Sequence, residues 1–172
     1  MNVWRQVRAI ALLPGVVVVL VPLVVLISTG SDFGWGLGEG VAVLPIFLGL
    51  ILIAVGFGLW LWTVRLFARV GRGTLAPWDP PMSLVVEGPY RHVRNPMIAA
   101  VLTALLGEAA LFGSLPLLIW FGCFFTLNYA GFRLYEEPGL ERRFGEDYRT
   151  YKRNVPRWLP RCTPWTPASE PE

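Results

Sequence analysis

Two long apolar segments without a charged residue constrain the fold of this 172-residue chain more than any other feature. Val41–Val64 runs for 24 residues and Leu115–Phe132 for 18 residues without Asp, Glu, Lys or Arg. A helix needs about 20 apolar residues to cross the hydrocarbon core of a bilayer. Only 16% of the chain is charged, against about 25% in a soluble domain. The sequence therefore predicts an all-α integral membrane protein.

Two further helices follow from the remaining apolar stretches. Residues 9–27 form an apolar stretch of about 19 residues, longer than the apolar part of a signal peptide, so we expect a retained helix. From Met97 to Phe132 the chain is apolar over 36 residues, which is too long for one crossing, and Gly113-Ser114 marks a turn. We therefore predict four transmembrane helices, at about 9–27, 41–64, 97–112 and 115–132, the last two as a tight antiparallel hairpin.

The basic residues are segregated along the chain. The 15 Lys and Arg residues fall in three regions, at Arg5 and Arg8, from Arg65 to Arg94, and from Arg133 to Arg161. Four crossings place all three regions on one side of the membrane, which the positive-inside rule makes the cytoplasm. We thus expect a multi-pass protein with both termini in the cytoplasm, and we interpret the net charge of +3 as an orientation signal rather than as nucleic-acid binding.

The polar tail contains one more periodic segment. Apolar residues recur at helical spacing among many charged ones, which predicts an amphipathic helix at about 139–155 on the cytoplasmic face. The apolar positions are Leu140, Phe144, Tyr148, Tyr151 and Val155. Several prolines follow Val155, and we expect disorder over residues 163–172. The chain from 1 to 172 is then a single membrane domain.

Candidate site residues gather at the cytoplasmic ends of the last two predicted helices. Asn95-Pro96 is a typical helix start, because Asn is a favoured N-cap and Pro a favoured first helical residue. Such a start exposes backbone N–H groups that can hold a carboxylate or phosphate. Arg133 precedes Glu136 and Glu137 by three and four residues. These three residues form either a local ion pair or a site in which a carboxylate faces a cation and the arginine faces an anion.

Three further observations bear on the chemistry. The single His92 and the distant Cys123 and Cys162 lack the spacing of a protein-built zinc site. Glu108 lies inside the third predicted helix, where acidic residues are functional candidates by default, unless it reaches the far interface. A glycine-rich nucleotide-binding motif is also absent from the sequence.

Several motifs of the C-terminal half resemble the isoprenylcysteine carboxyl methyltransferase and phospholipid methyltransferase superfamily, in particular its bacterial members. They are Gly88-Pro89-Tyr90-Arg91, Val93-Arg94-Asn95-Pro96, Glu136-Glu137, Leu140, Phe144-Gly145, Tyr148, Tyr151, Val155-Pro156-Arg157, Pro160 and the upstream Gly73–Trp78. The resemblance covers about Arg72–Pro160. It implies a compact helical enzyme of a bacterial inner membrane that uses S-adenosylmethionine and releases S-adenosylhomocysteine.

The same resemblance implies where the cofactor binds. The expected cofactor-binding residues are Tyr90, Arg94, Asn95, Pro96, Met97, Ile98 and Glu136, with Met82, Ser83, Leu84 and Val85 as a backbone wall. The chemistry of the cofactor agrees, because Glu136 suits its cationic part and Arg94 suits its carboxylate. Tyr90 can stack on the adenine or face the sulfonium. Asn95 departs from the family pattern, since many members have His there, but it keeps the capping role.

Methyl transfer to a membrane-soluble, lipophilic substrate at the cytoplasmic face is the leading hypothesis, with a carboxylate, amine, thiol or phenol as acceptor. Arg133 lies near the family's substrate-orienting arginine and would clamp an anionic acceptor. Glu137 is the candidate base for an amine or a thiol. The alternatives are an NADPH-dependent sterol- or steroid-type membrane reductase, whose larger cofactor usually accompanies more helices, and a non-catalytic membrane scaffold.

Overall fold

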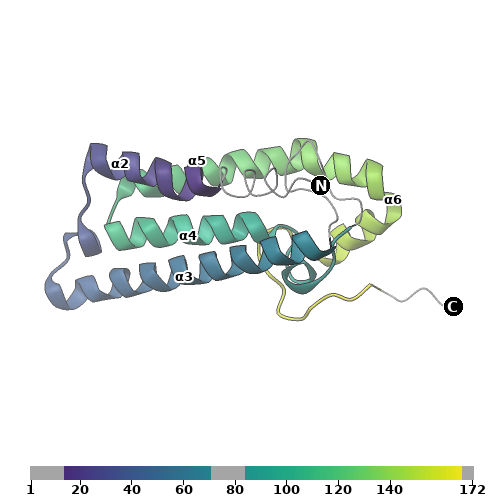
Figure 1. Ribbon diagram of the computed structural model, residues 1–172, viewed down its shortest axis with the longest axis horizontal. Coiled ribbons are helices and arrows are strands. Elements are labelled where there is room, and N and C mark those ends of the chain that lie inside the picture. Colours follow the sequence, from purple (N-terminus) through teal and green to yellow (C-terminus); the bar gives the residue numbers. More distant parts are fainter. Residues whose placement is uncertain (1–13, 71–83, 168–172) are drawn as a thin grey trace.

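The computed structural model describes residues 14–70 and 84–167, and residues 1–13, 71–83 and 168–172 lie outside this description (Figure 1). Every regular element among the described residues is helical. In chain order the elements are η1 (Val16–Leu20), α2 (Val21–Thr29), η2 (Phe33–Gly36), α3 (Glu39–Val70), η3 (Gly88–Arg91), α4 (Pro96–Phe112), α5 (Leu115–Gly131), η4 (Phe132–Glu136) and α6 (Glu137–Asn154).

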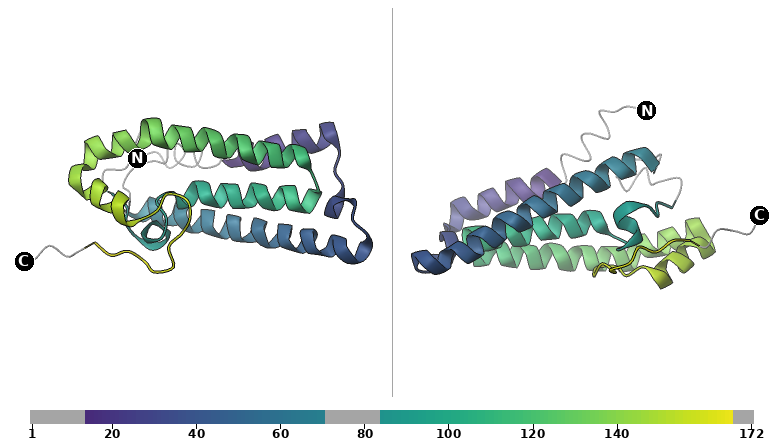
Figure 2. Two further views of the ribbon diagram at one scale, coloured as in Figure 1. Left: turned by 180° about the vertical axis from the view of Figure 1, so that it is seen from behind. Right: turned by 90° about the horizontal axis from the view of Figure 1, so that it is seen from below.

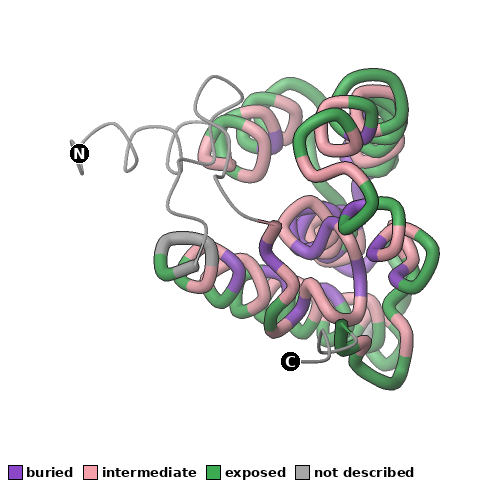
Figure 3. The backbone as a smooth tube through the Cα atoms, turned by 90° about the vertical axis from the view of Figure 1, so that its right-hand side faces the viewer, coloured by how far each residue is buried: buried purple, intermediate pink, exposed green. Residues whose placement is uncertain are grey.

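The short helix α4 is the central element of the bundle. It lies between α3 on one side and α2 and α5 on the other (Figures 1 and 2). Eight of its 17 residues are buried, among them Ala100, Leu105 and Ala109, and the surrounding helices are exposed mainly on their outer faces (Figure 3). The other helices of the bundle therefore pack around α4.

The outer helices present large exposed apolar faces. Three helical segments are long and apolar enough to cross a membrane: Val16–Gly36, Gly40–Leu66 and Leu115–Asn154, whose apolar part ends at Phe132. Helix α4 is shorter, at about 25 Å for its 17 residues. Large side chains such as Ile27, Phe47 and Leu127 are exposed on the outside. The protein is thus an integral membrane protein with three to four spanning helices.

Glycine residues allow α3 and α4 to lie very close together. A Cβ atom added at Gly56 would lie 2.7 Å from the Ala100 carbonyl oxygen, and one at Gly49 would lie 2.7 Å from the Gly107 carbonyl oxygen. Both distances are shorter than real Cβ contacts. Small residues at such crossings let helix backbones pack against each other in a membrane, which explains how α4 is held although it is short.

Both π turns precede a proline. Pro22 follows η1, and Pro138 follows η4. A proline inside a helix clashes with the carbonyl four residues earlier and has no N–H to donate. The wider π turn accommodates it without ending the helix. As a result α5, η4 and the first part of α6 form one continuous helix from Leu115 to Phe144, and the gap between the helices that we predicted at 115–132 and 139–155 is wrong.

Other predicted helix limits also need correction. We expected the second helix to end at Val64, but α3 continues to Val70. Arg65 and Arg69 lie in this extension, and arginine is a good helix former, so leaving the apolar region does not end the helix. The first predicted helix extends to Thr29 at its C-terminal end, while its residues 9–13 lie outside the described chain.

The real bend in the charged tail is at Gly145. Its φ of 54° and ψ of −125° are not helical and therefore interrupt α6. Glycine suits this position because residues with a Cβ atom rarely adopt such angles. The bend turns the second half of α6 back toward the bundle (Figure 1). Tyr148, Tyr151 and Val155 then become buried and pack with Leu84 among other residues.

The residues after α6 form an ordered strap against the start of α4. We refer to Val155–Thr166 as the C-terminal strap. Three backbone hydrogen bonds hold it: Arg94 N donates to Pro156 O (2.9 Å), Arg161 N to His92 O (3.0 Å) and Trp165 N to Arg91 O (2.9 Å). The predicted disorder from residue 163 is therefore wrong for residues 163–167, because Trp165 also packs on Tyr151 at a ring distance of 5.8 Å.

Candidate functional site

The site begins at the first turn of α4. The Asn95 side-chain oxygen accepts a hydrogen bond from Ile98 N (3.4 Å), and Pro96 occupies the first turn, as the sequence predicted. Asn95 is only 6% exposed. Its Nδ2 donor and the neighbouring Arg94 Nε donor are buried and have no hydrogen-bond partner among the described residues. Two buried donors that no described residue satisfies thus lie beside the positive end of a helix.

The 3-10 turn η3 places Tyr90 next to this helix start. Gly88 has a positive φ of 52°, which lets the chain turn there. The Tyr151 hydroxyl donates to the Tyr90 carbonyl oxygen (2.7 Å) and fixes the turn from the side of α6. Burial raises the pKa of the Tyr90 hydroxyl, and the charge of Glu136 raises it further. The Tyr90 phenol therefore stays neutral and lies within electrostatic reach of the Glu136 carboxyl.

Glu136 is accessible and makes no hydrogen bond or ion pair with another described residue. The pKa of its carboxyl is raised to about 7 by desolvation and then by the neighbouring Glu137 carboxylate. Since its side chain remains exposed, this desolvation is partial. An approaching cation would stabilise the charged form of this carboxyl, which agrees with the cation-binding role expected for Glu136.

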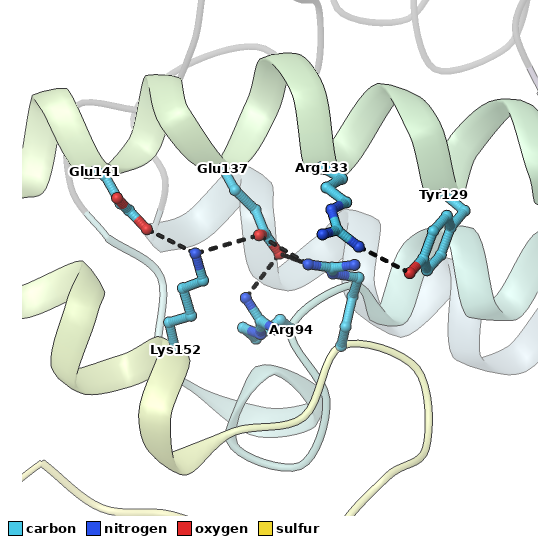
Figure 4. Close-up of polar contacts among 7 residues, drawn as sticks. Arg94, Tyr129, Arg133, Glu137, Glu141 and Lys152 are labelled. Carbon is cyan, nitrogen blue, oxygen red and sulfur yellow. Dashed lines mark hydrogen bonds and ion pairs between the residues drawn. The ribbon is translucent and has the colours of Figure 1, made fainter.

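Glu137, in contrast, is the centre of a buried ion network (Figure 4). Arg94 Nη1 donates to its Oε1 (2.8 Å), and Arg157 donates to Oε1 through Nε (2.7 Å) and to Oε2 through Nη2 (2.8 Å). Lys152 Nζ lies 3.4 Å from Oε2. A carboxylate has about four lone-pair positions, and these four contacts fill them. Glu137 therefore joins the start of α4, α6 and the C-terminal strap.

Arg133 does not form the local ion pair that its spacing allowed. Its one described polar contact is from Nη1 to the Tyr129 hydroxyl, at 3.5 Å (Figure 4). It borders an open cavity of about 390 Å³ lined by Arg133, Glu137, Pro138, Glu141, Lys152 and Arg157. Among the described residues no carboxylate pairs with Arg133, so its guanidinium is available to an anionic group.

The remaining predicted site residues have different environments. Val85 is buried, and Leu84 packs against the cluster of Tyr148 and Tyr151. Met97 and Ile98 are half-buried in the first turn of α4, and Ile98 packs on the core of the bundle. The predicted residues Met82 and Ser83 lie outside the described part of the chain.

Glu108 lies far from this cluster. It is 13 positions along α4 from Asn95, or about 20 Å at 1.5 Å per residue, and one turn from the end of α4 at Phe112. Its Oε2 is buried without a hydrogen-bond partner in the described chain. The structure does not bring it together with the other candidates. Nor do the described residues contain a group of three or more His, Cys, Asp or Glu side chains suited to a metal ion.

Arg157 and Lys152 are site residues to which the sequence analysis gave no role. Arg157 was part of the Val155-Pro156-Arg157 motif that carried the family resemblance, and this was the available signal. Its guanidinium carbon also lies 5.5 Å from the centre of the Tyr129 ring. Lys152 bridges Glu137 and Glu141, with 2.7 Å to Glu141 Oε1. Such contacts across the bend of α6 have no fixed spacing in the sequence.

The fold and this site define an all-helical integral membrane protein whose polar site lies at one end of the bundle, where the first turn of α4 meets α6. The sequence matches the phospholipid methyltransferase family over residues 44–147, more than half of the chain. The chain therefore belongs to this family, which indicates a membrane-bound methyltransferase. No curated protein and no solved structure matches the chain.

Proposed function

We propose that the protein transfers a methyl group from S-adenosylmethionine to a lipophilic acceptor at this end of the bundle. The observation that carries the proposal is the pair of buried donors at the start of α4, Arg94 Nε and Asn95 Nδ2, which have no partner within residues 14–70 and 84–167. Leaving a buried donor unsatisfied costs about 1–3 kcal/mol. A bound anionic group would satisfy both donors and would be favoured by the helix dipole. The carboxylate of S-adenosylmethionine fits this requirement.

The cofactor also carries two cations, an ammonium and a sulfonium, and Glu136 supplies the matching charge. Glu136 lies in the turn before Glu137, makes no ion pair with a described residue and is within electrostatic reach of Tyr90. Glu137 is already occupied by Arg94, Lys152 and Arg157. This difference favours Glu136 as the carboxylate that contacts the cofactor. When bound, S-adenosylmethionine would supply the methyl group, and the residues of this chain would orient it.

The same contacts favour a structural role for Glu137. A general base needs a free lone pair to accept a proton, and the four described contacts leave Glu137 none. A carboxylate acceptor requires no base, and Arg133 is free to clamp such an acceptor by paired hydrogen bonds. We keep Arg133 as the acceptor-orienting residue. The acceptor group itself, whether carboxylate, amine, thiol or phenol, stays open.

We further propose that this end of the bundle faces the cytoplasm of a bacterial inner membrane, with both termini on that side. The support is the location of Arg94, Arg133 and Arg157 at this end, together with the absence of Lys and Arg from Ser28–Gly40 at the other end. The lipophilic acceptor would then reach the site from the membrane, between the helices.

Isothermal titration of the purified protein with S-adenosylhomocysteine and with NADPH tests the proposal against its alternatives. We expect binding of S-adenosylhomocysteine alone. Binding of NADPH alone would favour the reductase, and binding of neither would favour the scaffold. The family match supports the first outcome. Failure to bind S-adenosylhomocysteine would sink the proposed function.

Two variants sharpen this test. Glu136→Ala should abolish binding while the protein stays folded, whereas Glu146→Ala removes an exposed carboxylate elsewhere on α6 and should bind normally. Asn95→Asp keeps an N-cap acceptor but replaces the Nδ2 donor by a negative charge. It should therefore weaken S-adenosylhomocysteine binding without loss of thermal stability. Normal binding by Glu136→Ala would refute the role of that carboxylate.

A further inference from the structure

The C-terminal strap contacts Arg94 in two ways. Its Pro156 carbonyl accepts a hydrogen bond from Arg94 N (2.9 Å). Its Arg157 side chain binds Glu137, which in turn binds Arg94 Nη1. The Glu137 Oε1 atom accepts from both arginines, at 2.8 Å and 2.7 Å. The direction of the Arg94 guanidinium, and with it the buried Nε donor, therefore depends on where Arg157 holds Glu137.

Arg157 is well suited to hold Glu137 in one place. Its Nε and Nη2 atoms form a paired contact with both carboxylate oxygens, the geometry that fixes a carboxylate best. The guanidinium also lies over the Tyr129 ring. The next residue, Trp158, packs between aromatic side chains, with ring distances of 5.4 Å to Phe125 and 6.0 Å to Phe132. Arg157 is thus fixed from both sides.

Lys152 is a weaker candidate for this task. It approaches Glu137 at 3.4 Å and Glu141 at 2.7 Å, so its main partner is Glu141. Its side chain is 37% exposed, while the side chain of Arg157 is 18% exposed. An ammonium also acts as a point charge and sets no plane for the carboxylate. Of Lys152 in α6 and Arg157 in the strap, Arg157 therefore determines the orientation of Glu137.

We propose that Arg157 is a positioning residue for the cofactor site: it holds Glu137, and through Glu137 it aims Arg94 at the ligand. This inference rests on the proposed function, because Arg94 is expected to meet the carboxylate of the cofactor. It assigns to the strap a role in binding that acts through Glu137 and Arg94. Removal of Arg157 should leave Arg94 in place but free to turn.

The test is the affinity for S-adenosylhomocysteine of four proteins: wild type, Arg157→Gln, Glu137→Gln and the double variant. Loss of a residue that orients a metal ligand weakens metal binding by about 10- to 100-fold, and by analogy we expect at least the lower value for Arg157→Gln. If Arg157 acts through Glu137, the double variant should bind no more weakly than Glu137→Gln. Additive losses would overturn the proposal, because they would mean that Arg157 acts independently.

Two further variants separate positioning from general stability. Arg153→Gln breaks a comparable pair, with Glu146 at 2.8 Å, that is exposed and does not reach Glu137, so it should bind normally. Arg157→Lys keeps the charge but not the paired geometry, and it should recover only part of the affinity. If Arg157→Gln does not fold, Arg157→Lys decides, and wild-type affinity in that variant would overturn the proposal. Failure of the wild type to bind refutes the proposed function instead.

Discussion

Replacing Gly145 by alanine tests how the bend in α6 holds the site together. At this position φ is 54° and ψ is −125°, and an added Cβ would meet no atom within 4 Å. The expected loss is therefore conformational rather than steric. Holding a residue with a Cβ in such a region costs about 1–3 kcal/mol. Because that conformation turns Tyr148 and Tyr151 into the buried cluster, the strain cannot be relieved without exposing them.

The same helix offers a matched control. An added Cβ at Gly139 also meets no atom within 4 Å, but Gly139 does not have a positive φ. Alanine in a helix is favoured over glycine by roughly 0.5–1 kcal/mol. Gly139→Ala should therefore stabilise the protein slightly, while Gly145→Ala should destabilise it. The two identical substitutions are expected to have opposite signs.

Thermal unfolding of the purified protein in detergent, followed by tryptophan fluorescence, measures both effects. For a chain of this size each kcal/mol shifts the midpoint by roughly 2–4 °C. Gly145→Ala should melt roughly 2–12 °C below wild type, and Gly139→Ala at or just above wild type. If Gly145→Ala melts with or above Gly139→Ala, the positive φ does not hold the bend and the reasoning fails.

Three further predictions follow from the charges. Glu137→Gln removes the carboxylate that pairs with Arg94 and Arg157, and it should lower the free energy of unfolding by about 3–5 kcal/mol. Glu146→Gln affects an exposed pair and should cost about 1 kcal/mol or less. Equal melting shifts of the two variants would contradict this prediction. Because the Glu136 carboxyl has a pKa of about 7, raised from 4.5, it ionises as the pH rises through 7. Titrations should then show tighter S-adenosylmethionine binding at higher pH and a flatter profile in Glu136→Gln. A cysteine at exposed Ser31 should react with impermeant maleimide only from outside the cell, and labelling from inside would invert the topology.

The apolar helices could be predicted because length and hydropathy are local properties of the sequence. The start of α4 was also predictable, since Asn95-Pro96 forms a cap within four residues. The helix ends that charge was expected to impose, at Val64 and at Phe132, were wrong. Charged residues such as Arg65 and Glu137 are tolerated in a helix, so a helix can continue where the chain passes from the membrane into water. Charge marks the membrane boundary and not the helix boundary.

The C-terminal strap could not be predicted from local patterns. Its prolines and lack of periodicity are typical of disorder, and its order comes from contacts with residues 91–94, about 70 positions earlier. The partners of Glu137 were hidden for the same reason. Spacing in the sequence indicated Arg133, but the observed partner Arg157 is 20 residues away and reaches Glu137 only because Gly145 turns the chain back.

Two adjacent carboxylates can therefore have different roles without any difference in chemistry. Successive residues on a helix point roughly 100° apart, so Glu137 faces the strap while Glu136 lies within electrostatic reach of Tyr90. The four contacts of Glu137 fix the start of α4, while Glu136 pairs with no described residue and, under the proposed function, meets a cation. A single carboxylate could not do both, because the contacts that fix α4 would neutralise the charge that the cofactor needs. Under the proposed function, the pair at the junction of η4 and α6 meets two requirements, to bind a ligand and to hold the binding residues in place.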